Sequence, residues 1–264
     1  MHSSLLERWL QGATICLLVA RPFTPGVAQA LHGQGAIYVV LWLLLVVAWL
    51  ALRLRNGDVR LHFAAVDVAV LLLFAWHTIA GCIACWQASP RPALNALWQW
   101  IAMAASYLLV RQLFKYPRAG RTLVVVMIGV ATAMAAIGLE QYFISTPAAR
   151  RAYDATKDDV DALYSMTGQW LPPGSPERKR YEDRLGSDEP AATFALTNSL
   201  AGFLAPWLVV LAGIGVVHLQ RSGGCERPGR CGTVLVASAV ALVACLGLTK
   251  SRSGYLATLI GLGL

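Results

Sequence analysis

An uncharged apolar run at residues 35–52 constrains the fold of this chain more than any other feature. Its length approaches the roughly 20 residues that a helix needs to cross a bilayer. Further apolar blocks occupy residues 10–20, 63–85, 94–113, 122–144, 191–219, 233–249 and 255–264. Lipid accepts only helices and closed barrels, and these blocks lack the alternation of barrel strands. The sequence therefore predicts an all-α, polytopic transmembrane helical bundle of about seven to eight spans.

The composition favours a membrane protein over a soluble one. Of the 264 residues, 57% are apolar and 14% are charged, whereas soluble domains average about 45–50% and about 25%. The formal charge of +8 would suggest nucleic acid as a partner of a soluble protein. Here the basic residues lie mainly between apolar blocks, where they orient spans. We therefore expect the lipid bilayer as a partner and no nucleic acid.

Loop charge predicts the orientation of the spans. The connections after the second, fourth and sixth blocks carry most of the basic residues: Arg53, Arg55, Arg60, Arg111, Lys115, Arg118, Arg121, Arg221, Arg227 and Arg230. The intervening short connections carry Arg21, Arg91, Lys250 and Arg252. Because basic residues mark the cytoplasmic side, we expect the N-terminus inside and residues 145–190 outside. In a diderm bacterium this describes an inner-membrane protein with a periplasmic loop.

The same topology divides the chain into three parts. Residues 1–144 are expected to hold transmembrane helices one to five, residues 145–190 a polar outer loop, and residues 191–264 helices six to eight. The outer loop has few large aliphatic residues, so we expect short helices at 154–164 and 176–185 but no separate domain. The last apolar block is too short to span a bilayer, which predicts that the natural protein continues further.

Asp67, His77 and Glu140 are ionisable and lie within the predicted spans, where a charge is costly. Asp67 lies about one turn into its span, and we favour a packing role beside Arg60 or a neighbouring span. His77 fits a hydrogen bond between helices at least as well as a functional role. Glu140 lies at the outer end of its span, on the side of the outer loop. A role in a site and a structural role are about equally compatible with this position.

One polar segment enters a predicted span from the outside at residues 189–204. Thr193, Thr197 and Asn198 lie within about one and a half helical turns, so they can present polar groups together. Small residues in the same segment also suit close helix packing without any site.

A second polar segment, residues 248–257, places Lys250 and Arg252 at the outer membrane boundary. An arginine at this depth can fork onto the phosphate oxygens of a lipid pyrophosphate. The alternative is an ordinary interfacial anchor.

The segments at residues 189–204 and 248–257, taken in this order along the chain, resemble two motifs of the O-antigen ligase/O-antigen polymerase family of bacterial polytopic membrane proteins. Members typically carry a GTF-x-NPN-x-LA-x-(Y/F)-L stretch and later a T-x-SRG-x-x-LA stretch, each entering a span. The matching residues are Thr193, Phe194, Asn198, Leu200, Ala201, Phe203, Leu204, Thr249, Ser251, Arg252, Leu256 and Ala257. Residues 138–143 also resemble the family's G-(I/L)-x-Q-x-F stretch at the end of the preceding span. The resemblance covers roughly residues 137–264.

The chain departs from the family pattern at three places. Glu189 stands where many members have an arginine, and Arg184 lies five residues further upstream. The glycine after the Ser-Arg pair is displaced by one, to Gly254. The family's acceptor-deprotonating histidine would lie beyond Leu264.

The resemblance implies a glycosyltransferase with a C-type membrane fold, acting in cell-surface polysaccharide (O-antigen) biosynthesis. The donor would be an undecaprenyl-diphosphate-linked glycan and the acceptor a hydroxyl of a glycan or lipid, with no nucleotide or metal cofactor. The catalytic candidates are Arg252 on the pyrophosphate, assisted by Lys250 or Arg184, together with Glu140 near the sugar. The substrate-binding candidates are Lys250, Ser251, Asn198, Thr197, Thr193 and Glu189.

Two other functions compete with this interpretation. A transporter or flippase would carry inverted repeats and broken helices near the bilayer midplane, whereas the polar motifs here cluster at the outer boundary. A non-enzymatic scaffold or sensor would use residues 145–190 to bind a partner, and it would tolerate substitution of Arg252 and Asn198.

Overall fold

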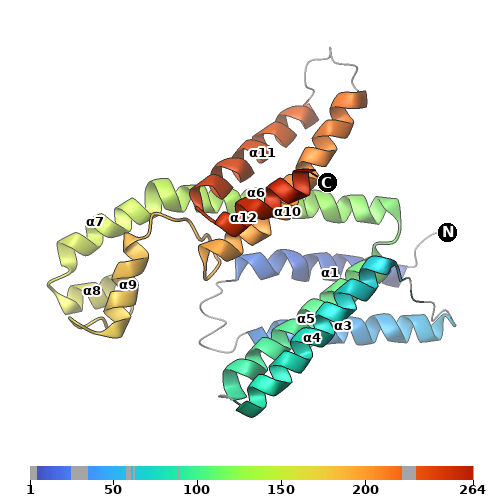
Figure 1. The fold of residues 1–264 in the computed structure, drawn as a ribbon, viewed down its shortest axis with the longest axis horizontal. Helices are drawn as coiled ribbons and strands as arrows, with labels where there is room; N and C mark the ends of the chain where they lie inside the picture. Colours follow the sequence, from blue (N-terminus) through green and yellow to red (C-terminus); the bar gives the residue numbers. More distant parts are fainter. Residues whose placement is uncertain are drawn as a thin grey trace. The chain divides into compact units, whose positions relative to one another are not determined.

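The computed structural model describes residues 5–24, 35–57, 61, 63–87, 90–221 and 230–263. Within these ranges the chain forms helices joined by connecting segments, and no strand occurs (Figure 1). The prediction of an all-α protein is therefore confirmed for the described residues. The chain divides into two compact units, Met1–Met127 and Ile128–Leu264.

The described part of the first unit contains four complete helices and the start of a fifth. They are α1 (Leu5–Phe23), α3 (Gly35–Arg55), α4 (Ala65–Gln87), α5 (Pro90–Leu113) and α6 (Pro117–Glu140), which continues into the second unit. Each overlaps one of the predicted apolar blocks. Helix α3 ends where Gly57 adopts a left-handed conformation at φ +65°, because glycine accepts this conformation without a steric penalty.

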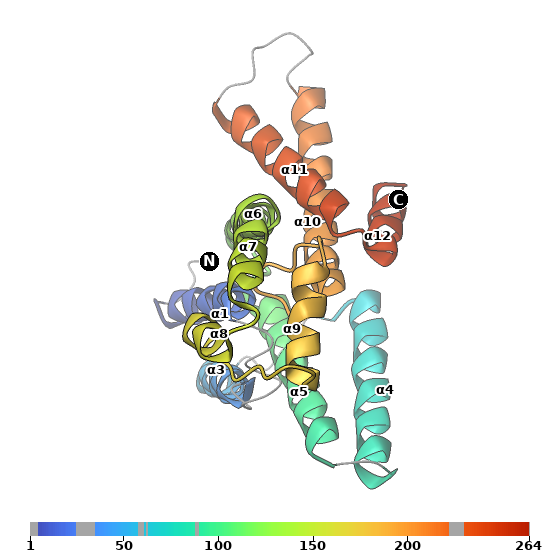
Figure 2. The same cartoon turned by 90° about the vertical axis from the view of Figure 1, so that its left-hand side faces the viewer.

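Large side chains from α1, α3 and α5 form the core of the first unit. The buried members are Leu10, Trp42, Trp49, Ala105, Leu109 and Leu113. The side-chain amide of Gln11 donates to the carbonyl oxygen of Leu113 at 2.8 Å, which ties α1 to the end of α5. Helices α4 and α5 pack side by side as a hairpin (Figure 2). Their close approach depends on Gly81, where a Cβ would lie 2.5 Å from Cδ1 of Leu97.

In the second unit, residues 145–190 are mostly helical rather than an extended loop. Helix α6 continues through a π-helical turn, η1 (Gln141–Ser145), into α7 (Thr146–Thr156). Helix α8 (Val160–Thr167) follows, so the single helix expected at 154–164 is two helices. The break occurs because the Asp159 side chain caps α8, accepting from the backbone N–H groups of its first turn.

Helix α9 (Pro176–Gly186) confirms the helix expected at 176–185. Its Ser175 hydroxyl accepts from the Arg178 N–H at 3.2 Å, and Pro176 occupies the first turn, where proline is favoured. Serine caps and first-turn prolines are local signals, which is why the sequence alone located this helix closely.

A small core holds α7, α8 and α9 together, although few aliphatic residues were available for one. Tyr153, Leu163 and Leu171 are buried, with further side chains of α9 packed against them. The Tyr153 hydroxyl donates to the Glu182 carboxylate, and Nε of Arg178 lies 3.1 Å from the same carboxylate. The hydrogen bond from Tyr153, followed by that from Arg178, lowers the pKa of Glu182.

Helices α10 (Thr197–Arg221), α11 (Arg230–Leu248) and α12 (Arg252–Gly263) complete the second unit. Close packing at Gly138 joins α6 to this group, because a Cβ there would lie 2.7 Å from Sγ of Cys245 and 3.5 Å from Cδ2 of Leu200. A glycine at this position lets the helices approach more closely than any side chain would allow.

Within the described residues, five helical segments are long and apolar enough to cross a membrane: Ala36–Arg55, Ala65–Trp86, Ala93–Leu113, Pro117–Thr156 and Thr197–His218. A sixth apolar helix, Gly232–Leu248, is shorter. These features support a multi-pass membrane protein, whereas the count of seven to eight spans remains a prediction.

The orientation also remains a prediction. Among the loop cations that carry it, Arg60 and Arg227 lie outside the described residues, as do the side chains of Arg91, Arg221 and Arg230.

Candidate functional site

Helices α10 and α12 bring the two polar motifs of the sequence together. A Cβ built on Gly254 would lie 2.8 Å from the Cβ of Ala201, and one on Gly261 would lie 2.8 Å from a methyl group of Val209. Because the residue numbers increase in the same direction along both helices, α10 and α12 run parallel. Their N-termini therefore lie at the same end, although 55 residues separate Thr197 from Arg252 in the chain.

A groove of about 600 Å³ runs along this helix pair. Small and apolar residues line most of it, whereas polar side chains come from the first turn of each helix. The lining residues are Asn198, Gly202, Ala205, Pro206, Val209, Val210, Ser253, Gly254, Ala257 and Gly261. The groove therefore has a polar end at the two helix N-termini and an apolar body further along both helices.

The turn into α12 is fixed by buried hydroxyl groups. Ser251 is 2% exposed, and its Oγ accepts from the Gly254 N–H at 3.2 Å as the N-cap of α12. The Thr249 hydroxyl donates to the carbonyl oxygen of Leu246 at 2.6 Å. Ser251, expected from the sequence to bind substrate, thus has a capping role that orients the start of α12.

Two exposed cations, Lys250 and Arg252, flank this N-cap. Lys250 adopts a left-handed backbone conformation at φ +51°, and Arg252 occupies the first position of α12. Neither side chain has a hydrogen bond or an ion pair with another residue of the described part of the chain. A cation at a helix N-terminus is unfavourable because the helix dipole is positive there. The two cations and the two helix N-termini give this end of the helix pair a positive potential, which the C-terminus of α11 at Leu248 offsets in part.

No acidic residue offsets that potential within the first turn of α10 or α12. The orphan N–H groups at two neighbouring helix N-termini suit a phosphate or another anion. The groove can therefore take an elongated apolar chain that carries an anionic group at one end.

Gln141 holds the segment that leads into α10. Its side-chain nitrogen donates to the carbonyl oxygen of Ala192 at 2.8 Å, and the Ala192 N–H donates to its Oε1, also at 2.8 Å. Ala192 adopts φ +50°, a conformation that costs a non-glycine residue about 1–3 kcal/mol. In the sequence, Gln141 stands out only as part of the motif at residues 138–143, and nothing there indicates that it holds Ala192.

The other residues of the first motif divide between packing and the groove. The Thr193 hydroxyl contacts Sδ of Met134 at 3.4 Å, which places it against α6. Thr197 is half-buried at the start of α10, and Asn198 is exposed and lines the groove.

Of the nine predicted site residues, all of them described, Asn198 lines the groove and the other eight do not. Glu140 is exposed and accepts from the Ser145 hydroxyl at 2.5 Å. It lies two residues, or about 200° around the helix, from Gly138, so it projects from the opposite face. Arg184 is exposed near the end of α9, and Glu189 is exposed ahead of α10.

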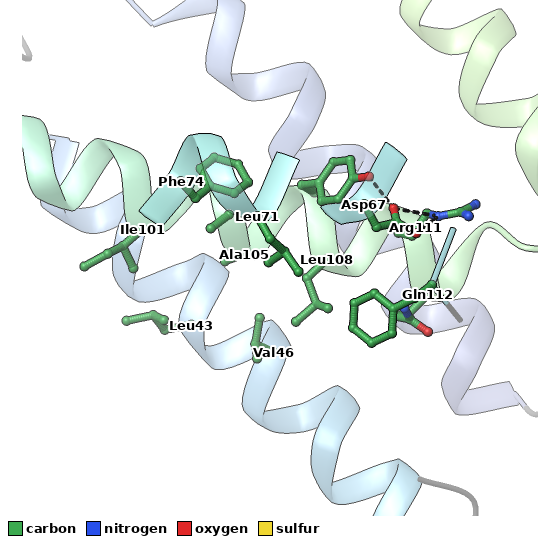
Figure 3. A pocket seen from close by; sticks show the side chains of 13 residues that line it. Leu43, Val46, Asp67, Leu71, Phe74, Ile101, Ala105, Leu108, Arg111 and Gln112 are labelled. Atoms are coloured by element: carbon green, nitrogen blue, oxygen red, sulfur yellow. Dashed lines mark hydrogen bonds and ion pairs between the residues drawn. The ribbon is translucent and has the colours of Figure 1, made fainter. Parts of the chain in front are cut away.

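The two ionisable residues of α4 have structural partners in the first unit. Asp67 contacts Arg111 and Tyr107 of α5 (Figure 3), as expected for packing against a neighbouring span. His77 contacts the carbonyl oxygen of Leu73 at 2.9 Å, and its ring lies 3.8 Å from that of Trp100 on α5. The packing role favoured for Asp67 is confirmed, whereas the hydrogen bond of His77 lies within α4 rather than between helices.

Comparisons with known proteins add no identity to this site. No family model matches the chain, and neither the curated proteins nor the solved structures contain a match. The family resemblance consequently rests on the motif residues alone.

Proposed function

We propose that this chain belongs to a membrane glycan ligase or polymerase of the O-antigen type. The enzyme would transfer a glycan from undecaprenyl diphosphate to an acceptor hydroxyl of a glycan or lipid. In this proposal the chain forms seven to eight spans of a C-type glycosyltransferase fold in the inner membrane, with residues 145–190 in the periplasm. The observation that carries the proposal is the groove between α10 and α12, whose polar end, lined by Asn198 and Ser253, is next to Lys250 and Arg252 in the chain.

The shape and charge of the groove suit a polyprenyl diphosphate. The isoprenoid chain would lie along the small residues of α10 and α12, where its burial is favourable. The diphosphate would meet the two helix N-termini, with Arg252 donating a forked pair of hydrogen bonds and Lys250 adding a second charge. Asn198 would contact the first sugar from the rim.

The reaction makes one bond and breaks one bond at the anomeric carbon. The acceptor oxygen attacks this carbon, and the bond from carbon to the diphosphate oxygen breaks, so that the electron pair leaves with the diphosphate. Arg252 and Lys250 stabilise the charge that develops on the leaving group. The acceptor proton passes to a general base, a role that the family resemblance assigns to a histidine.

Substitution of Arg252 tests this proposal directly. Arg252 is exposed and has no recorded partner in the described part of the chain, so Arg252→Gln should leave folding intact. We expect glycan transfer in membrane vesicles to fall about 100-fold or more, the loss typical of removing one electrostatic stabiliser. Arg180→Gln, an exposed substitution on α9, is the matched control and should retain activity.

The assay should use the natural full-length protein, with insertion and expression checked for each variant. Wild-type transfer activity from Arg252→Gln in properly inserted protein would refute the proposed role of the groove. Uptake of a labelled solute without any glycan transfer would instead favour a transporter.

A further inference from the structure

A second cavity lies within the first unit, between α3, α4 and α5 (Figure 3). Its volume is about 340 Å³, at the lower end of the range of about 300–1,000 Å³ for small-molecule sites. Aliphatic and aromatic side chains, including Leu43, Phe74 and Ile101, line most of it. Asp67, together with Arg111 and Tyr107, lies at one end. None of these residues belongs to the proposed glycan groove.

At this end the carboxylate of Asp67 has a full set of partners. Asp67 is 2% exposed and accepts from Nε of Arg111 at 3.0 and 3.1 Å through its two oxygens. The Tyr107 hydroxyl and the Ala64 N–H also donate to it. A buried carboxylate with this many donors is satisfied and offers no free oxygen to a ligand.

Arg111, in contrast, uses only part of its hydrogen-bonding capacity. Its side chain is 43% exposed, and its hydrogen bonds to Asp67 involve Nε alone. Figure 3 shows the rest of the guanidinium extending beyond Asp67 and away from the apolar lining. Its terminal nitrogens make no hydrogen bond to another described residue. Because arginine carries five N–H donors in a fork, this end can still bind an oxyanion.

The surrounding charge is also positive. Lys115, Arg118 and Arg121 follow Arg111 within ten residues of the chain. Among the described residues of this unit, the acids are Glu7 and Asp67. An anionic headgroup is therefore complementary to this end of the cavity, whereas a cationic one is not.

The length of the cavity corresponds to one leaflet of a bilayer. Along α5 it extends from Ile101 to Arg111, which is about 15 Å at the helical rise of 1.5 Å per residue. The hydrocarbon core of a bilayer is about 30 Å thick. The cavity consequently extends over about half of that thickness, from the charged end to the depth of the midplane.

We propose that this cavity binds an anionic phospholipid. One acyl chain lies between α3, α4 and α5, and the terminal nitrogens of Arg111 donate to the phosphate of the headgroup. Asp67 holds the guanidinium in place through Nε. Phosphatidylglycerol has the chemistry required, since its phosphate charge is not offset by an amine.

Native mass spectrometry of the purified full chain tests this proposal. The protein is released from detergent after addition of phosphatidylglycerol, phosphatidylcholine or inorganic phosphate. We expect one phosphatidylglycerol retained per chain, with a preference over phosphatidylcholine on the order of tenfold, as charged hydrogen bonds provide. Equal retention of the two lipids would overturn the proposal, as would displacement of phosphatidylglycerol by inorganic phosphate at equal concentration.

Two variants separate the headgroup from the acyl chain. Arg111→Gln combined with Asp67→Asn removes both charges together, so no buried charge is left unpaired, and it should abolish the preference for phosphatidylglycerol. Ala104→Phe fills the cavity and should reduce retention about tenfold or more. Ala75→Phe places the same ring on an exposed position of α4 and serves as the control.

Folding of each variant is checked by circular dichroism and by monodispersity in detergent. If the double charge variant fails to fold, Ala104→Phe and the comparison of lipids still decide the question. Unchanged retention of phosphatidylglycerol by folded Ala104→Phe would show that the lipid binds elsewhere.

Discussion

Replacement of Gln141 by leucine offers the sharpest test of how the second unit positions its groove. Leucine has a similar size but removes both hydrogen bonds to Ala192, each 2.8 Å long. A net hydrogen bond contributes about 0.5–1.5 kcal/mol, so the pair contributes about 2 kcal/mol. We expect the whole of this free energy to be lost, because Ala192 would remain at φ +50° without the contacts that hold it there.

The effect can be measured by thermal unfolding of the protein in detergent. For a chain of this size, 1 kcal/mol shifts the midpoint by about 2–4 °C, so Gln141→Leu should lower it by about 4–8 °C. Gln220→Ala removes an exposed glutamine near the end of α10 and should leave the midpoint unchanged. Both variants must retain the helical content of the wild type before unfolding.

A change of less than 1 °C in Gln141→Leu would refute this reasoning. Such a result would mean that the segment before α10 is held by other contacts and that the two hydrogen bonds exchange freely with water. A loss of stability without any loss of glycan transfer would have a different meaning. It would show that Gln141 contributes to folding but is not needed to position Asn198 in the groove.

Three further perturbations have defined outcomes. Gly254→Val should destabilise the protein by about 1–3 kcal/mol in denaturant unfolding, because α12 must move away from α10, whereas Gly213→Val has open space around it and should cost less. Asp67→Asn should cost about 1–2 kcal/mol by the same measurement, since it weakens charged hydrogen bonds to a partly exposed arginine. The depressed pKa of Glu182 stabilises α7, α8 and α9 above the unfolded pKa of about 4.3, and this stability is lost as pH falls through the folded pKa. Hydrogen exchange across these helices should show that loss, and Glu182→Gln should flatten it.

Local signals in the sequence predicted the helices well. The apolar blocks located α3, α4 and α5, because a long uncharged run has few alternatives to a helix in lipid. Proline after a serine located α9. The break between α7 and α8 was missed because Asp159 lies within an acidic cluster, where its role as a cap is not distinguishable from that of its neighbours.

The site was less accessible to sequence reasoning. The motifs indicated Asn198 and Arg252, but their approach to one groove depends on tertiary packing at Gly254 and Gly261. The buried cap made by Ser251 and the role of Gln141 also require knowledge of distant backbone atoms. The sequence of a motif does not indicate whether a polar side chain in it contacts a ligand or the main chain.

The concentration of positive potential at one end of the groove follows from topology as much as from charge. Helices α10 and α12 run in the same direction, so their N-termini lie at one end of the helix pair. Each N-terminus contributes a partial positive charge of about half a unit, to which Lys250 and Arg252 add. Arg252 at the first position of α12 is therefore unfavourable for the isolated helix. A bound anion would relieve this repulsion, and the relief would add to its binding affinity.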